Sequence, residues 1–297
     1  MASSIPAFAT PSGATDNRRA PVGALPRRLF GNQAAAIGLV IVTVFVLLAL
    51  TADLLPLRNP LQIVGSSRMA GPSWALPLGA DTFGRDILSR IVFGARLSLQ
   101  VSVVSVAIAL VVGSALGLIA GYAGGWPDQI IMRTMDVLFA FPTVLLALGI
   151  VAALGPNPAN VIIAIGIVYT PIFARVVRGP VLAVKEREFV EAARAIGARA
   201  TRIISRHVLP NLMSVLIVQT SIALSWAVLT EASLSFLGLS AQPPAPSWGS
   251  MLNEGRQNLE LAPHMAIFPG LAIMLVVLGF NLLGDGLRDV LDPRSRR

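Results

Sequence analysis

Residues 188–211 read EFVEAARAIGARATRIISRHVLPN, a polar and basic stretch that lies between two strongly apolar segments. Gly197 divides it, because glycine weakens a helix interior and suits a helix end. A second short helix should follow and end at Pro210. The sequence therefore predicts a helix-turn-helix that is too short and too polar to cross a bilayer. Its first helix carries apolar residues at positions i, i+3, i+4 and i+7, the spacing of one helix face: Phe189, Ala192, Ala193 and Ile196.

This helix-turn-helix has two interpretations. It is either an ordinary loop between two membrane helices or a docking element for a soluble partner. The second interpretation rests on its small apolar face inside a charged rim, a combination that is typical of protein–protein interfaces. The segment alone leaves both interpretations open.

The composition of the chain indicates an integral membrane protein. Apolar residues make up 55% of the 297 residues, mean hydropathy is +0.74, and only 13% of the residues are charged. That is about half the charged fraction of a typical soluble domain. The chain has no cysteine, which excludes a disulfide framework and a thiolate metal site. The net charge of +8 comes from arginines that flank apolar segments, so we interpret it as a topology signal and expect no nucleic-acid partner.

Six segments are long and apolar enough to span a membrane, so the predicted fold class is an all-α integral membrane protein with six transmembrane helices. If the N-terminus is inside, the inner connections hold 17 Lys and Arg residues and the outer connections hold six. Positive residues favour the cytoplasmic side, so both termini and residues 188–211 are expected in the cytoplasm. The spans are expected near residues 34–52, 97–120, 137–154, 159–177, 212–230 and 265–284.

The spans define a domain organisation. The first outer connection should contain a short interfacial helix, capped by Asp81, that leads into the second span. Just before the third span, Arg133 and Asp136 are expected to lie on one helix edge and pair, and Pro142 is expected to kink the third span. The expected parts are a cytoplasmic tail (1–33), the first span (34–52), an extracytoplasmic connection (53–96), a core domain with five spans (97–286) and a second cytoplasmic tail (287–297).

The second span contains a row of small residues. Gly113, Gly117 and Gly121 are spaced four residues apart and therefore share one helix face. Small residues at this spacing let two helix backbones approach closely. We expect this face to pack against another helix, either within the same subunit or in a second one.

The chain lacks the motifs of an enzyme or of an ion-coupled carrier. Its only lysine, Lys185, has no phosphate-binding loop around it, and no HExxH motif occurs. The two histidines, His207 and His264, are far apart, so neither a metal site nor a catalytic residue is predicted. The spans hold almost no ionisable residue at mid-depth, whereas proton- or sodium-coupled carriers usually need some. Glu231 falls near a span end, where solvation or capping accounts for it.

Part of residues 188–211 resembles the EAA loop of permease subunits in ATP-binding-cassette importers. The match consists of Glu191-Ala192-Ala193, three further residues, Gly197, and later Leu209-Pro210. In that family the loop, here about 185–211, contains the coupling helix, which sits in a groove of the cytoplasmic ATPase. An apolar residue is usual where this chain has His207, and the basic ending RHVLPN resembles the peptide-transporter branch. The resemblance implies these docking residues: Phe189, Glu191, Ala192, Ala193, Ile196, Gly197, Arg199, His207, Leu209 and Pro210.

Three further strings resemble the same family in the same order. They are LPLGADTFGRDILSRIVFGARLSL at 76–99, GGWPDQIIMRTMDVLFAFPTVLLAL at 124–148 and EASLSFLGLSAQPPAPSWGSMLNEG at 231–255. The last string supplies Phe236, Pro243, Pro244 and Trp248. These residues belong either to a constrained loop with aromatic side chains at the membrane interface or to an outer gate that contacts a solute-binding protein.

The chain is thus identified as a member of the dipeptide/oligopeptide/nickel permease family, and as the C-type permease of its pair. The resemblance implies a type I importer permease fold in the plasma or inner membrane of a bacterium or archaeon. The implied partners are a second homologous permease in a heterodimer, two cytoplasmic ATPase subunits, an extracytoplasmic solute-binding protein and membrane lipid. ATP and magnesium would bind to the ATPase subunits, so no cofactor is expected in this chain.

The solute implied by the resemblance is a di- or oligopeptide. An importer of nickel or of another small solute in the same family is an alternative. A self-contained secondary carrier or channel is an alternative from a different class, since it explains six spans equally well. It does not explain a cytoplasmic docking element or the scarcity of charge within the spans.

Overall fold

The computed structural model describes residues 32–291, and over this range the chain is helical, with no β-strand. The predicted all-α fold class is confirmed. In chain order the elements are α2 (Gln33–Thr51), the short 3-10 helix η2 (Gly65–Ser67), α3 (Ile87–Ala123), α4 (Gly125–Phe139), α5 (Thr143–Leu154), α6 (Pro158–Lys185), α7 (Glu188–Ala195), α8 (Ala200–Ile203), η3 (Ile204–Val208), α9 (Leu209–Phe236), α10 (Trp248–Arg256) and α11 (His264–Leu291). The predicted tail 1–33 lies almost wholly outside the described residues, as does the end of the tail 287–297.

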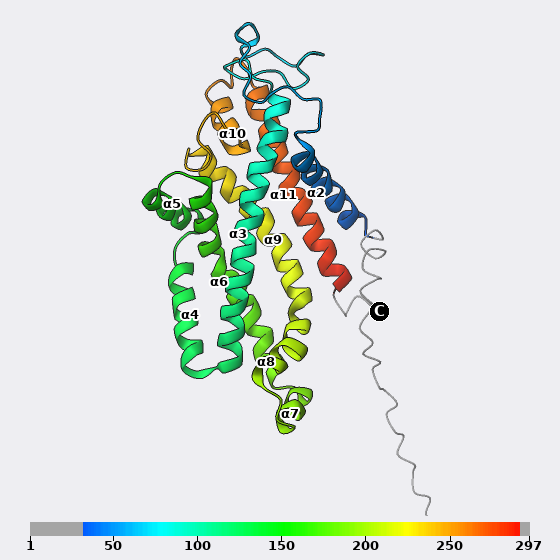
Figure 1. Ribbon diagram of the computed structural model, residues 1–297, viewed down its shortest axis with the longest axis vertical. Coiled ribbons are helices and arrows are strands. Elements are labelled where there is room, and N and C mark those ends of the chain that lie inside the picture. The colour runs from blue at the N-terminus through cyan, green and yellow to red at the C-terminus, as the bar shows by residue number, and fades with distance from the viewer. Residues whose placement is uncertain (1–31, 292–297) are drawn as a thin grey trace, which may run out of the picture.

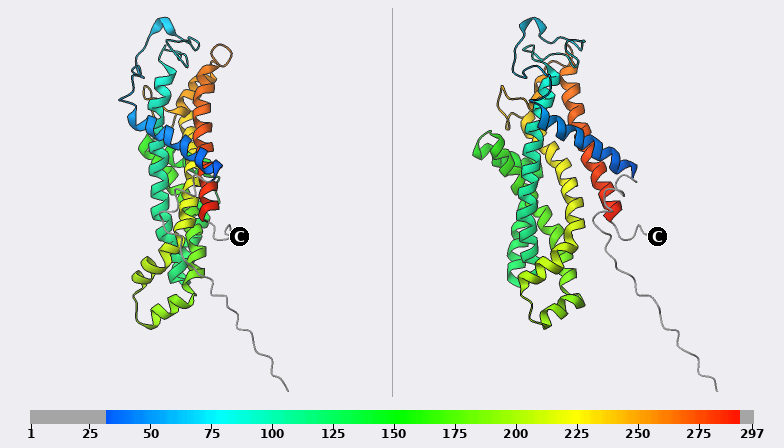
Figure 2. Two further views of the ribbon diagram at one scale, coloured as in Figure 1. Left: turned by 90° about the vertical axis from the view of Figure 1, so that its right-hand side faces the viewer. Right: turned by 45° about the vertical axis from the view of Figure 1, so that its right-hand side comes forward.

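The helices form an elongated bundle (Figure 1). α3, α6 and α9 run lengthwise through it, α2 packs against α11 and α3, and α4 and α5 pack against α6. The α7 helix lies at one end of the bundle, whereas α10 and the connection 52–86 lie at the opposite end, as the turned views in Figure 2 also show. The predicted docking element and the predicted outer connections are therefore at opposite ends of the molecule.

Five helices are long and apolar enough to cross a membrane, and a sixth span exists only if α4 and α5 are counted together. These two helices are bent by 90° at the break between them, so the predicted third span at 137–154 is not one helix. Pro142 is the residue directly before α5, with φ −56°. Proline has no N–H to donate and clashes with the preceding turn, so it separates two helices here where we predicted only a kink.

The α3 helix begins at Ile87, ten residues before the predicted start of the second span. Its N-cap is Asp86, whose carboxylate accepts hydrogen bonds from the backbone N–H groups of Leu88 and Ser89 at 3.3 and 3.2 Å. The prediction of a separate interfacial helix capped by Asp81 is therefore wrong. The residues from Ile87 onward instead form the first turns of α3. This helix has 37 residues and is about 55 Å long, which is longer than a bilayer core is thick.

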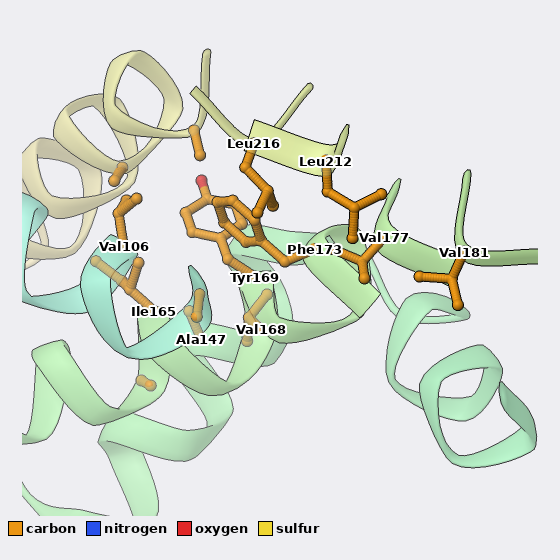
Figure 3. Close-up of a cluster of buried hydrophobic side chains, with 14 of the residues drawn as sticks. Val106, Ala147, Ile165, Val168, Tyr169, Phe173, Val177, Val181, Leu212 and Leu216 are labelled. Atoms are coloured by element: carbon orange, nitrogen blue, oxygen red, sulfur yellow. The ribbon is translucent and has the colours of Figure 1, made fainter. Parts of the chain in front are cut away.

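The main hydrophobic core lies between α3, α6 and α9 (Figure 3). Val106 of α3, Ile165 and Phe173 of α6, and Leu212 of α9 are all buried in it. The ring of Tyr169 belongs to the same cluster, and its hydroxyl lies 2.8 Å from Thr230 Oγ1 on α9. A second core joins α2, the start of α3, α10 and α11.

Residues from Ala200 to Phe236 form one continuous helical stretch of 37 residues. Pro210 lies in the first turn of α9 and does not end a helix, which corrects the prediction. The residues directly before it form the π-helical turn η3, in which the N–H of Leu209 bonds to the carbonyl of Ile204. This wider turn accommodates a proline, which has no N–H to complete a regular helical hydrogen bond.

Candidate functional site

The predicted docking element is anchored by one face of α7. Val190 is fully buried and Ala193 is 8% exposed, and both belong to the main hydrophobic core together with Ile203 and Val208. The two α7 residues are three apart in sequence and therefore point to the same side. Ala193 thus faces the rest of the protein, which corrects the prediction that placed it on the docking face.

The adjoining face of α7, which extends to its C-cap Ile196, carries exposed apolar side chains. Phe189 is 41% exposed and Ile196 is 86% exposed, and Ala192 between them is also exposed. We call Phe189, Ala192 and Ile196 the α7 patch. Exposed charged residues surround it, among them Glu191 and Arg199. The structure therefore places apolar side chains inside a charged rim at one end of the molecule.

Two aromatic contacts fix the position of the α7 patch. The rings of Phe189 and His207 lie 5.8 Å apart between centroids, so His207 supports the patch from the η3 turn. The guanidinium of Arg194 lies 5.7 Å from the ring centroid of Tyr122, near the end of α3. These contacts connect α7 to the end of α3 and to the η3 turn, and α9 begins at Leu209, directly after η3.

Gly197 ends the α7 segment in the left-handed conformation, with φ +80°. Its N–H bonds to the carbonyl of Arg194 at 2.9 Å, and the N–H of Ala198 bonds to the carbonyl of Ala193 at 3.0 Å. This is the hydrogen-bond pattern of a glycine that closes a helix C-terminus. A Cβ on Gly197 would meet no atom within 4 Å, so the backbone conformation alone favours glycine here.

The three glycines of the predicted packing face lie against α6. A Cβ on Gly113 would stand 2.5 Å from the carbonyl oxygen of Thr170, and one on Gly117 would stand 2.4 Å from that of Ala174. A Cβ on Gly121 would lie 2.8 Å from Cβ of Val181. The row of small residues lets α3 and α6 pack backbone to backbone within this subunit.

Two ion pairs join α4 to α6. Arg178 binds both carboxylate oxygens of Asp128 at 2.6 Å. Arg175 binds Asp136 at 2.7 Å, so the partner of Asp136 is on another helix and is not Arg133 as we predicted. The guanidinium of Arg175 also lies 4.2 Å from the ring centroid of Phe139. These pairs hold α4 alongside α6, which sequence spacing within α4 could not reveal.

Trp248 is fully buried, contrary to both interpretations of the last outer connection. Its indole N–H donates to the carbonyl of Ile91 at 3.0 Å, and its ring meets Phe45 edge to face at 5.7 Å between centroids. It therefore fixes α10 against α3 and α2, where it can contact neither a partner nor the membrane interface. Of the other residues predicted there, Phe236 is half-buried, and the following Pro243 and Pro244 are exposed.

A largely buried cluster of charges that the sequence did not indicate lies at the same end. Arg85 binds Asp81 at 2.5 Å and Glu254 of α10 at 3.1 Å. Arg90, almost fully buried, lies 3.4 Å from Asp81 and 3.6 Å from Glu254. Burial raises the pKa of the Glu254 carboxyl, while the two arginines oppose this shift. The cluster ties the outer connection to α10.

Glu231 also departs from expectation, because it is fully buried and is neither solvated nor a helix cap. Within residues 32–291, no group of three or more His, Cys, Asp or Glu side chains is arranged to hold a metal ion. The residues that stand out in the described chain are therefore the α7 patch at one end and the packed charges and Trp248 at the other.

Comparisons with known proteins agree with these features. A family model described as "Binding-protein-dependent transport system inner membrane component" matches residues 113–297. The dipeptide transport system permease protein DppC of Alkalihalophilus pseudofirmus is 50% identical over 270 residues, which cover 91% of this chain and 89% of that protein. The glutathione transport system permease protein GsiD of Pectobacterium atrosepticum is 54% identical over 226 residues, 76% of this chain and 75% of that protein.

Solved structures show the same fold at lower sequence identity. The MetNI methionine ABC transporter, in an inward-facing conformation, matches with a TM-score of 0.57 and 20% identity over 69% of this chain and 98% of that chain. An amino acid ABC transporter matches with a TM-score of 0.54 and 15% identity over 69% of this chain and 95% of that chain.

Proposed function

The chain belongs to the family of binding-protein-dependent transport system inner membrane components, the permeases of ATP-binding-cassette importers, and on this premise we propose that it is the C-type permease subunit of an ATP-driven importer of small peptides. Two relatives that share at least half of their aligned residues with it are named dipeptide and glutathione permease proteins. Glutathione is itself a tripeptide, so both names point to solutes of two or three residues.

The α7 patch is the observation that carries this proposal. Phe189 and Ile196 expose apolar surface at the tip of the bundle, inside a rim of charged residues. Such a rim suits a soluble protein partner and not lipid, because charged groups are costly to place in hydrocarbon. Val190 and Ala193 anchor the same helix to the core, so a movement of a partner bound at the patch is transmitted to the membrane helices. We assign the patch to an ATPase subunit.

The rest of the assembly follows from this assignment. We place α7 and both termini in the cytoplasm and the connection 52–86 with α10 on the outer face, because Lys and Arg are concentrated on the α7 side. A homologous second permease, two ATPase subunits and an extracytoplasmic solute-binding protein complete the importer in the inner membrane of a bacterium. ATP and magnesium belong to the ATPase subunits, and this chain transmits their motion mechanically.

A groove of about 400 Å³ between α5, α6 and α9 supports a role in the translocation path. Polar side chains at membrane depth are favoured next to protein or water and disfavoured next to lipid. We propose that the groove forms this subunit's half of the path, which the second permease completes. The groove is lined by Pro142, Thr143, Tyr169, Gln219, Trp226 and Thr230, together with apolar neighbours.

Reconstitution tests the proposed function. Liposomes that contain this chain, its second permease and the ATPase subunits should take up labelled dipeptide or glutathione only with ATP and the loaded solute-binding protein. Liposomes with this chain alone should show no solute-specific flux. If the chain alone carried the solute, it would be a secondary carrier or channel and the proposed function would be wrong. A complex that transported nickel and no peptide would overturn the proposed solute class.

A further inference from the structure

The outer end of α9 holds a buried carboxyl that does not line the groove assigned to the transport path. Glu231 is fully buried, and its Oε1 accepts a hydrogen bond from the hydroxyl of Ser240 at 3.3 Å. Ser98 of α3 lies beside the same carboxyl. Within the described chain, no ion pair includes Glu231, and its Oε2 has no well-formed hydrogen bond. A buried carboxyl without a cation is costly, so its position on α9 requires an explanation.

Ser240 belongs to residues 237–247, which we call the outer loop. This loop joins α9 to α10 and contains the exposed Pro243 and Pro244. Ser240 itself is fully buried, so Glu231 contacts the loop on its buried side. Without the carboxyl, the buried Ser240 hydroxyl would lose this acceptor, and an unpaired buried hydroxyl is destabilising.

The far end of the outer loop is also attached to α9. The hydroxyls of Ser235 and Ser247 lie 2.5 Å apart. A Cβ added to Gly249 would stand 2.2 Å from the carbonyl oxygen of Ala232, so the first turn of α10 lies directly on α9. The contact between Glu231 and Ser240 is therefore the first of three attachments between α9 and the segment that follows it.

The helical stretch that contains α9 begins at the turn after α7. Ala200 to Phe236 is continuous, and 37 residues of helix span about 55 Å. Figure 2 shows this stretch running from the α7 end towards the end that carries α10. A displacement at the α7 end is therefore carried along this stretch to the outer loop, most directly through the contacts that fix the loop to the helix.

We propose that Glu231 is a positioning residue that makes the outer loop move with α9 as one body, so that docking of the solute-binding protein on the exposed loop is transmitted to the ATPase at the α7 patch. This inference rests on the proposed function. It assigns Glu231 neither to the solute nor to the ATPase, and it predicts that loosening the loop uncouples the two ends of α9 without disassembling the importer.

The test compares the ATPase activity of the assembled importer, in nanodiscs, with and without the loaded solute-binding protein. Glu231→Leu keeps the side-chain volume and removes the acceptor, and Ser240→Ala removes the donor. Both should lower the stimulation by the binding protein about fivefold or more. Coupling between two sites typically changes the response at one of them by about fivefold or more, and these variants should remove that coupling. Basal ATPase activity and recovery of the ATPase subunits should stay near the wild-type values.

Two variants serve as controls. Glu231→Gln keeps an acceptor for Ser240 and should keep most of the stimulation. Ser221→Ala removes a buried hydroxyl of α9 that bonds only to its own helix, at the carbonyl of Ile217, and should leave the stimulation unchanged. If Glu231→Leu does not assemble, Ser240→Ala decides the matter.

Wild-type stimulation in the Ser240→Ala complex would overturn the proposal. An equal loss of basal and stimulated activity would also overturn it, because that is the effect of a residue needed only for folding. Failure of the proposed function has a different signature, since the wild-type complex itself would then show no ATP-dependent uptake.

Discussion

Arg178 of α6 and Asp128 of α4 form a bidentate ion pair, in which Nε and Nη2 of the guanidinium each lie 2.6 Å from a different carboxylate oxygen. The two residues are 50 positions apart in the chain. Two parallel charge-assisted hydrogen bonds fix the orientation of the helices as well as their distance. The ion pair fixes α6 to α4, just as the close contact of the three α3 glycines fixes α6 to α3.

The first prediction concerns this pair. Asp128→Ala should lower the free energy of unfolding by about 1.5–3 kcal/mol, the usual contribution of hydrogen bonds to charged groups. Arg178→Lys should lose part of the same stability, because lysine keeps the charge and loses the planar fork. Thermal unfolding in detergent measures both. The double variant Asp128→Ala/Arg178→Ala should lose less stability than the sum of the losses of its two single variants, Asp128→Ala and Arg178→Ala. Strictly additive losses would contradict a direct interaction.

The second prediction concerns the contact between α3 and α6. Gly113→Ala and Gly117→Ala each place a methyl group against the α6 backbone, and overpacking of this kind costs about 1–3 kcal/mol. Gly179→Ala is the matched control on α6, because a Cβ there meets no atom within 4 Å. The control should be neutral or stabilising by up to about 1 kcal/mol. Equal melting temperatures for all three variants would show that the helices do not pack through the glycine face.

The third prediction separates the two faces of α7. Ile196→Asp places a charge in the exposed patch and should abolish uptake and co-purification of the ATPase subunits, with no change in the thermal stability of the permease. Ala193→Trp should lower that stability, because Ala193 is buried in the core. Pull-down and thermal unfolding, carried out on the same preparations, distinguish the two effects. Normal ATPase recovery and normal uptake with Ile196→Asp would mean that α7 is only a connecting loop.

The fourth prediction tests the left-handed conformation of Gly197. Gly197→Val should weaken ATPase recovery, since a β-branched residue at positive φ costs at least about 1–2 kcal/mol and favours a different turn. Gly197→Asn should retain most of it, because asparagine tolerates this conformation far better. The side chains themselves meet no neighbour, so a similar loss in both variants would point to the docking surface and not to the backbone.

The fifth prediction concerns orientation. The chain has no cysteine, so single cysteines can be introduced at exposed positions. In intact cells, Trp74→Cys should react with an impermeant thiol reagent and Ile196→Cys should be protected until the cells are opened. Both side chains are strongly exposed in the isolated subunit. The opposite labelling pattern would reverse the proposed orientation.

The sequence by itself determined the membrane class, the positions of most spans and the helix-turn-helix at residues 188–211. These follow from local physics: continuous apolar runs require burial in lipid or protein, and charged residues with a central glycine cannot continue such a run. The four-residue spacing of the glycines likewise predicted a close helix contact, since their common face is a property of one helix.

Only the tertiary structure decided which side of each helix faces inward and which residues meet across the bundle. The periodic pattern of α7 could not tell that Ala193 is buried while Ile196 is exposed, because small residues suit both environments. Asp136 pairs with Arg175 and not with its neighbour Arg133, and Trp248 is buried, because residues far apart in the chain supply their partners. Glu231 resembled a solvated helix end in the sequence, but in the structure it is buried, beside Ser98 of α3 and Ser240 of the outer loop.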